Sequence, residues 1–184
     1  MMTMRKILLM GTLALGLAAV GAGCSSNTPT AAPLCPEILI PADTAKLTRF
    51  KPGPGRDIID VLHEEQITGF GHRCTFDTDA TGAGEVLVEV APSIESTIGP
   101  TNPTKVAEFE YFLAVTDQDK TILDKARFPV TITFPANMSR VQWQRQDAIS
   151  MRIPLQAGQR GEDFTIFLGL QLTREELEYQ RRTK

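Results

Sequence analysis

The sequence predicts an all-β protein, a single antiparallel β-sandwich of immunoglobulin-like type that ends in a short helix. Three observations lead to this fold. Apolar and polar residues alternate with a period of two in five segments, the pattern of strands that place one face on a core. Clusters of Gly, Pro, Asn and Asp separate these segments at hairpin-like spacing. No helical pattern lies between the segments, which favours a sandwich over a mixed fold.

The predicted strands follow in order along residues 35–172, the expected sandwich domain. Residues 35–40 and 45–50 are candidate edge strands, and the prolines and glycines of 51–57 form a turn. The alternating apolar sets are Phe70, His72, Cys74 and Phe76; Val86, Val88 and Val90; Ala107, Phe109, Tyr111, Leu113 and Val115; Phe128, Val130, Ile132 and Phe134; and Phe164, Ile166, Leu168, Leu170 and Leu172. This pattern makes His72 a core or sheet histidine.

A helix is expected over residues 173–184. Thr173 stands where an N-cap belongs and Glu176 follows three residues later, which is a capping box. Acidic residues open the segment and arginines close it, as the helix dipole favours. The helix is either docked on the sandwich or ordered only on a partner. Its candidate partner-binding residues are Leu177, Tyr179, Arg181 and Arg182.

The first 23 residues have the pattern of a secretory signal peptide. Arg5 and Lys6 precede an apolar run over residues 7–20, and small residues follow it. The run is too short to span a bilayer, which takes about 20 apolar residues. A retained N-terminal anchor is the alternative interpretation.

Cys24 is the predicted lipidation site. The small residues at 21–23 resemble the cleavage box of bacterial lipoproteins, although Gly21 stands where that box prefers a branched aliphatic residue. Residues 24–34 are rich in Ser, Thr and Pro and would form a flexible, lipidated tether. Ser25 resembles the residue that follows the cysteine in lipoproteins sorted to the outer membrane, so we expect a location there, facing the periplasm. Ordinary cleavage that leaves Cys24 a free thiol is the alternative.

The number of cysteines points to one disulfide. The chain has three cysteines, an odd number that is awkward outside the cytosol. With Cys24 assigned to lipid, Cys35 and Cys74 are expected to form a bridge in an oxidising compartment. Two buried free thiols are the alternative.

Candidate sites for metal ions and catalysis are few. The best is the loop 77–85, where Asp77, Asp79, Thr81 and Glu85 supply oxygen ligands around a glycine, as at the start of an EF-hand loop. The acidic residue expected at the twelfth position of that loop is Val88, so a polar hairpin is the favoured interpretation.

The remaining polar residues indicate no catalytic chemistry. A zinc site at His63, His72 and Cys74 would need the disulfide thiol. Glu64 and Glu65 face opposite ways on a strand, so they do not form a carboxylate pair. The sequence has no nucleophile elbow, and we expect no cofactor.

Three segments, "CPEILIPADTAKLTRFKPGPGRDIIDV", "FEYFLAV" and "DFTIFLGLQLTREELEYQRR", resemble an uncharacterised family of small Gram-negative envelope lipoproteins. The resemblance implies a lipid anchor and a β-rich body, and it assigns no catalytic or binding residue.

The expected function is a non-catalytic binding or scaffold module for another envelope protein. The net charge of −3 argues against nucleic acid as a partner. A periplasmic carrier of a small ligand or of calcium is the alternative, and an enzyme is the least favoured class.

Overall fold

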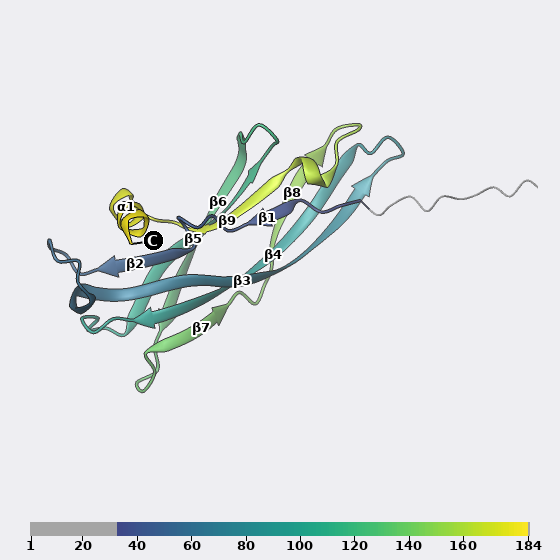
Figure 1. The fold of residues 1–184 in the computed structure, drawn as a ribbon. Helices are drawn as coiled ribbons and strands as arrows, with labels where there is room; N and C mark the ends of the chain where they lie inside the picture. Colours follow the sequence, from purple (N-terminus) through teal and green to yellow (C-terminus); the bar gives the residue numbers. More distant parts are fainter. Residues whose placement is uncertain (1–32, 184) are drawn as a thin grey trace, which may run out of the picture. The chain divides into compact units, whose positions relative to one another are not determined.

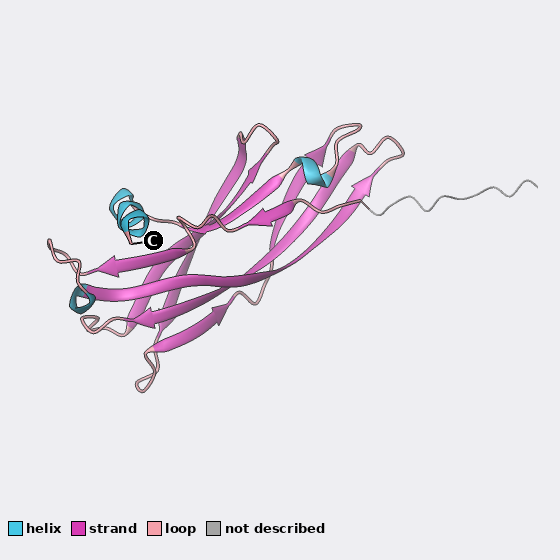
Figure 2. Cartoon of the chain, in the orientation of Figure 1, coloured by secondary structure: helices cyan, strands magenta, loops and turns pink. Residues whose placement is uncertain are grey.

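The structure is a computed structural model that describes residues 33–183 (Figure 1). Cys24, residues 1–23 and most of the predicted tether therefore lie outside the described residues. The described chain belongs to one compact unit built from two sheets (Figure 2).

The first sheet has four strands in the order β1-β9-β5-β6. Its members are β1 (Glu37–Leu39), β9 (Thr165–Leu170), β5 (Val106–Thr116) and β6 (Ile122–Thr133). β1 runs parallel to β9, while the other pairs are antiparallel. With three residues, β1 is a short edge strand, as the sequence indicated.

The second sheet has the order β2-β3-β4-β7, and β8 also pairs with β4. Its members are β2 (Lys46–Phe50), β3 (Val61–Thr78), β4 (Gly84–Ile98), β7 (Arg140–Gln144) and β8 (Ile149–Leu155). β4 has 15 residues and is therefore about 50 Å long. On the side of β4 opposite β3, two short strands pair with it end to end, β8 beside residues 84–90 and β7 beside residues 93–97.

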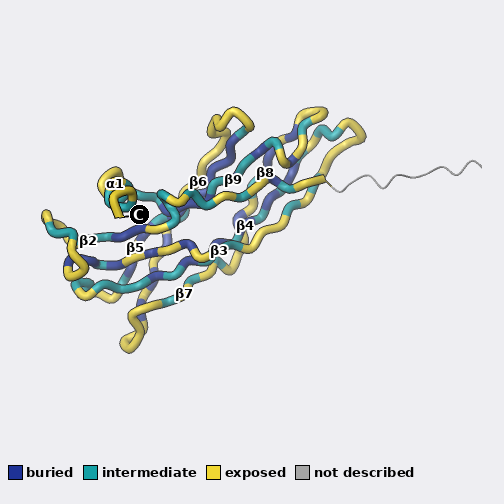
Figure 3. The backbone as a smooth tube through the Cα atoms, viewed as in Figure 1, coloured by how far each residue is buried: buried dark blue, intermediate teal, exposed yellow. Residues whose placement is uncertain are grey.

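The core lies between the two sheets and is built from the predicted alternation. Along β4 the side chains of Val86, Val88, Val90 and Ile94 are fully buried, and their neighbours are half-buried. Tyr111, Leu113, Ile166, Leu168 and Leu170 close the core from the other sheet. Figure 3 shows buried residues along the strands and exposed ones in the loops. Each such aliphatic side chain contributes about 1.5–3 kcal/mol by leaving water.

The all-β sandwich with a short C-terminal helix is confirmed. In detail, the strand order differs from that of immunoglobulin constant domains, whose sheets are ABED and CFG. Here β2, β3 and β4 are successive neighbours within one sheet, joined by the loop 51–60 and by the short turn 79–83.

A β-bulge in β3 reverses which side chains face the core. The register between β3 and β4 shifts between Ile67 and Gly69. Val61, His63, Glu65 and Ile67 are buried before the bulge, and the half-buried residues after it are Phe70, Cys74 and Phe76. His72 shares their parity but is exposed, so it is a sheet histidine and not a core one.

The disulfide between Cys35 and Cys74 is present, with 6.0 Å between the two Cα atoms. It fastens the start of the described chain to the far end of β3. The helix α1 (Arg174–Arg182) lies instead near the start of β3, against β2 (Figure 1). A strand rises about 3.3 Å per residue, so roughly 40 Å of β3 separates Cys74 from Val61. No described helix is long and apolar enough to cross a membrane.

Candidate functional site

The helix α1 begins with the capping box that the sequence predicts. The Thr173 hydroxyl oxygen accepts a hydrogen bond from the Glu176 amide at 3.2 Å, and the Glu176 carboxylate accepts one from the Thr173 amide at 2.8 Å. Two amides that the first helical turn leaves unpaired are thereby satisfied. A nine-residue helix is marginal alone, so its tertiary contacts decide whether it is ordered.

Those contacts place α1 across the free edge of β2. Thr48 and Arg49 are consecutive in β2 and point to opposite faces of the sheet. The Gln180 side chain donates a hydrogen bond to the Thr48 hydroxyl at 3.2 Å, while the Glu176 carboxylate accepts one from Arg49 Nε at 3.0 Å. The helix thus contacts side chains on both faces of β2 and covers the open edge of this strand. Covering an edge strand with a helix is one way in which proteins protect it from pairing with other chains.

An aromatic pair and a second ion pair complete the docking. The ring centroids of Tyr179 and Phe50 are 4.9 Å apart in an edge-to-face arrangement. Arg181 Nε lies 2.9 Å from the Asp43 carboxylate in an exposed ion pair. The structure therefore realises the docked alternative for the predicted helix.

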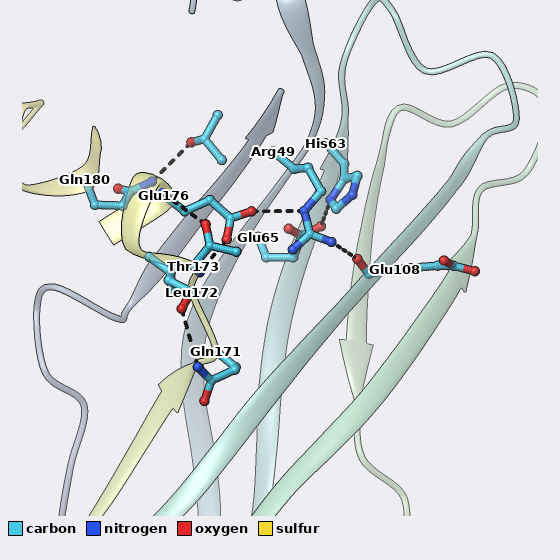
Figure 4. A network of polar contacts seen from close by, with 10 residues as sticks. Arg49, His63, Glu65, Glu108, Gln171, Leu172, Thr173, Glu176 and Gln180 are labelled. Carbon is cyan, nitrogen blue, oxygen red and sulfur yellow. Dashed lines mark hydrogen bonds and ion pairs between the residues drawn. The ribbon is translucent and has the colours of Figure 1, made fainter. Parts of the chain in front are cut away.

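Arg49 joins the helix to both sheets (Figure 4). Besides Glu176, its guanidinium donates a hydrogen bond to the carbonyl oxygen of Glu108 in β5 at 2.7 Å. Arg49 lines three open hollows, and the two larger ones have volumes of about 540 and 580 Å³. The larger one is lined by Arg49, Leu62, His63, Asn102, Pro103, Thr104, Val106 and Glu108. We call this region, from Arg49 to α1, the Arg49 junction.

A buried polar network lies beneath the Arg49 junction. His63 faces Arg49 across the β2–β3 ladder, and Glu65 faces Ser96 across the β3–β4 ladder. One carboxylate oxygen of Glu65 lies 2.8 Å from His63 Nδ1 and accepts a hydrogen bond from the Ser96 hydroxyl at 3.0 Å. Glu65 is 2% exposed and His63 is 4% exposed. The other carboxylate oxygen of Glu65 has no hydrogen-bond partner among the described residues.

This network does not have the geometry of a serine hydrolase triad. In a triad the imidazole contacts the nucleophilic hydroxyl and the carboxylate lies behind the imidazole. Here the carboxylate lies between the two, so the Ser96 hydroxyl is bonded to Glu65 and not to His63. Ser96 is also fully buried. The arrangement links strands β3 and β4, and His63 is also one of the residues that line the larger hollow.

The loop 77–85, whose oxygen ligands made it the best candidate for a metal site, folds as the polar hairpin that the sequence favours. One Asp79 carboxylate oxygen accepts hydrogen bonds from the Thr81 hydroxyl and amide at 2.6 and 2.8 Å, and from the Ala83 amide at 3.2 Å. These bonds, above all the one from the Thr81 hydroxyl, hold the pKa of the Asp79 carboxyl below its usual value. Glu85 pairs with Arg152 on β8. The structure does not gather Asp77, Asp79, Thr81 and Glu85 around one point, and no group of three or more His, Cys, Asp or Glu within residues 33–183 could hold a metal ion.

The predicted partner-binding residues are used within the chain to different degrees. Tyr179 and Arg181 make the docking contacts described above, and Leu177 is half-buried. Arg182 is exposed. Lipidation of Cys24 concerns a residue outside the described range.

Sequence reasoning did not find the Arg49 junction. His63 and Glu65 lie at every second position between Val61 and Ile67, so they share a face of the strand with these apolar residues. Polar residues on an apolar face were the signal in the sequence that could have indicated a buried polar network. Arg49 and Ser96 reach this network only through strand pairing, which the sequence did not specify.

No protein-family model, curated protein or solved structure matches the chain.

Proposed function

We propose that the protein is a lipid-anchored envelope protein whose sandwich is a non-catalytic binding or scaffold module for another envelope protein. The observation that carries the proposal is the Cys35–Cys74 disulfide. Because this bridge uses two of the three cysteines, Cys24 is the thiol left over, and it directly follows the signal-like segment. Disulfides persist in the oxidising compartments that such segments lead to.

The position of the bridge supports different roles for the two ends of the sandwich: attachment at one end and partner binding at the other. The predicted tether joins the described chain at Cys35, beside Cys74, so the anchor holds that end of β3. The Arg49 junction and α1 lie at the other end, roughly 40 Å along the strand. A module held in this way presents its α1 end to a partner, and the exposed Arg182 belongs to that surface.

The proposal is tested by cross-linking the full-length tagged protein in its own envelope and identifying what is captured. The wild type is expected to stay with the membrane fraction and to capture an envelope protein. Cys24→Ser is the matched variant, because it removes the lipidation thiol and leaves the bridge intact. A Cys24→Ser protein that still fractionates with membranes would contradict the anchor, and capture of no protein by the wild type would contradict the binding module.

A small-ligand carrier remains a second candidate because the larger hollow at the Arg49 junction has the volume of a ligand site. At about 580 Å³ it lies within the usual range of ligand pockets, about 300–1,000 Å³. Native mass spectrometry of protein purified from its envelope tests this candidate by looking for a bound small molecule.

A further inference from the structure

Two isoleucines at the α1 end of the sandwich are exposed to solvent. Ile58 is 80% exposed and Ile59 is 64% exposed, and they are adjacent in the short 3-10 helix η1 (Ile58–Asp60). Ile58 is the most exposed large apolar side chain within residues 33–183. Single exposed apolar residues are ordinary, whereas contiguous apolar surface marks binding sites, and Ile58 and Ile59 are adjacent.

The loop that carries the pair, residues 51–60, is closed at its base by Asp60. The Lys51 amide donates a hydrogen bond to the Asp60 carbonyl at 2.9 Å, and the Lys51 amine lies 2.7 Å from the Asp60 carboxylate. Asp60 and Asp57 exchange hydrogen bonds at 2.8 and 3.1 Å. Asp60 itself is buried, so the two isoleucines are displayed by a turn whose third residue is fixed in the protein.

Glycine is required where this loop folds back on Asp60. A Cβ atom on Gly55 would lie 2.3 Å from the Asp60 carboxylate, well inside van der Waals contact. Gly53 has a φ of 127°, which side-chain-bearing residues rarely adopt. The turn "KPGPGRD" therefore folds closely against Asp60.

The helix α1 braces the same loop through Arg56. The Arg56 guanidinium donates hydrogen bonds to the carbonyl oxygens of Gly53 and Gly55 at 2.7 and 2.5 Å, and it pairs with Glu175 of the helix. It also lies over the ring of Phe50, 5.3 Å from the centroid, while Tyr179 of α1 contacts the same ring. Helix and loop thus form one ordered unit.

We infer that Ile58 and Ile59 are the apolar anchor with which this module enters an apolar pocket on its envelope protein partner. The inference rests on the proposed function and names the surface that performs it. A segment whose backbone is already ordered loses little backbone entropy on binding, so an apolar pair carried by it contributes much of its burial to affinity. A few residues that fill pockets on the partner carry most of the binding energy of an interface.

The charges around the pair favour a protein pocket over a lipid surface. Apolar tips that insert into membranes are accompanied by clusters of unpaired Lys and Arg, which attract anionic lipids. Here the two basic residues of the loop, Lys51 and Arg56, are each paired with a carboxylate, and the neighbouring Asp57 is exposed. A polar rim of mixed sign around an apolar centre is the arrangement of a protein interface.

The test compares two double variants of the full-length lipoprotein in the cross-linking capture described above. In the first, Ile58→Ser and Ile59→Ser remove the anchor. In the second, Ile122→Ser and Leu123→Ser remove an exposed apolar pair on β6, where the side chains are 61% and 52% exposed. The first is expected to lower partner capture roughly 10- to 100-fold, and the second to leave it unchanged. Both variants should keep the wild-type melting temperature, because all four side chains are exposed.

A photo-reactive residue at position 58, with one at position 122 for comparison, identifies what the anchor touches. A protein adduct formed only from position 58 supports the inference, and an adduct with lipid only would overturn it. Wild-type capture of a partner that the first variant captures equally well would overturn the inference and leave the proposed function standing. Capture of no protein by the wild type would overturn both.

Discussion

Replacing Cys35 and Cys74 together by serine removes the link that closes a loop of 39 residues. For a loop of that length the loss of chain entropy on cross-linking is about 13 cal/mol/K, which corresponds to about 3.9 kcal/mol at 25 °C. Small domains have unfolding free energies of about 5–15 kcal/mol, so this bridge supplies a large share of the total. For a domain of this size the same loss lowers the melting temperature by roughly 8–16 °C.

The assay is urea unfolding of the wild type, of the double serine variant and of wild type reduced with a thiol reagent. The reduced protein and the double variant are expected to lose the same free energy, because both lack only the bridge. Cys24→Ser is the matched control and should unfold like the wild type. Thiol titration of the unfolded, unreduced protein should find no free thiol at positions 35 and 74.

A loss of less than about 1 kcal/mol in the double serine variant would refute the reasoning, because the entropy of a loop of this length is several times larger. Such a result would mean that the unfolded chain already holds the two segments together.

Three further predictions concern the α1 end of the sandwich. His63→Leu alone should cost about 3–5 kcal/mol in urea unfolding, because it leaves the Glu65 carboxylate buried without its imidazole partner. Replacing both His63 and Glu65 by leucine should restore stability, and a double variant as unstable as the single one would contradict the pairing. Tyr179→Ala should weaken the docking of α1 by about 0.5–1.5 kcal/mol and speed amide exchange in the helix alone, so exchange at the wild-type rate would contradict it. The hydrogen bond from Lys51 holds the pKa of the Asp60 carboxyl below its ordinary value of 3.8. A lowered pKa contributes stability above that ordinary value and loses it as the pH falls through the lower, folded value. NMR signals of residues 51–60 should therefore stay native from neutral pH down to about pH 4 and change only below it. A change near neutral pH would contradict this.

The features that the sequence predicted are those determined by neighbours in the chain. The capping box of Thr173 and Glu176 needs only a spacing of three residues, and it is present as expected. The alternation in β4, β5 and β9 follows from one buried face, because a strand repeats every two residues. The disulfide followed from an odd number of cysteines, which is a property of composition.

The features that were missed depend on contacts between distant segments. The bulge between Ile67 and Gly69 shifts the parity of β3, so the apolar pattern read from Phe70 onward could not be extended back to His63. β7 does alternate polar and apolar residues, but it is only five residues long and none of its side chains is fully buried. Arg49 gains its role only when β2, β5 and α1 meet.

The two ends of the sandwich differ in a way that stability alone does not account for. The end with the bridge is closed covalently, by a bond that adds several kcal/mol. At the other end, one buried Glu65 oxygen has no hydrogen-bond partner among residues 33–183, and Ile58 and Ile59 are exposed; both features lower stability or solubility. This end also retains a marginal helix that is held by side-chain contacts to the body. Exposed apolar pairs occur at both ends, because Ile122 and Leu123 follow the turn that joins β5 to β6, near the start of β9 and β1. What distinguishes the α1 end is the unsatisfied Glu65 oxygen beside a helix held by side-chain contacts, and proteins depart from good packing in this way at functional sites.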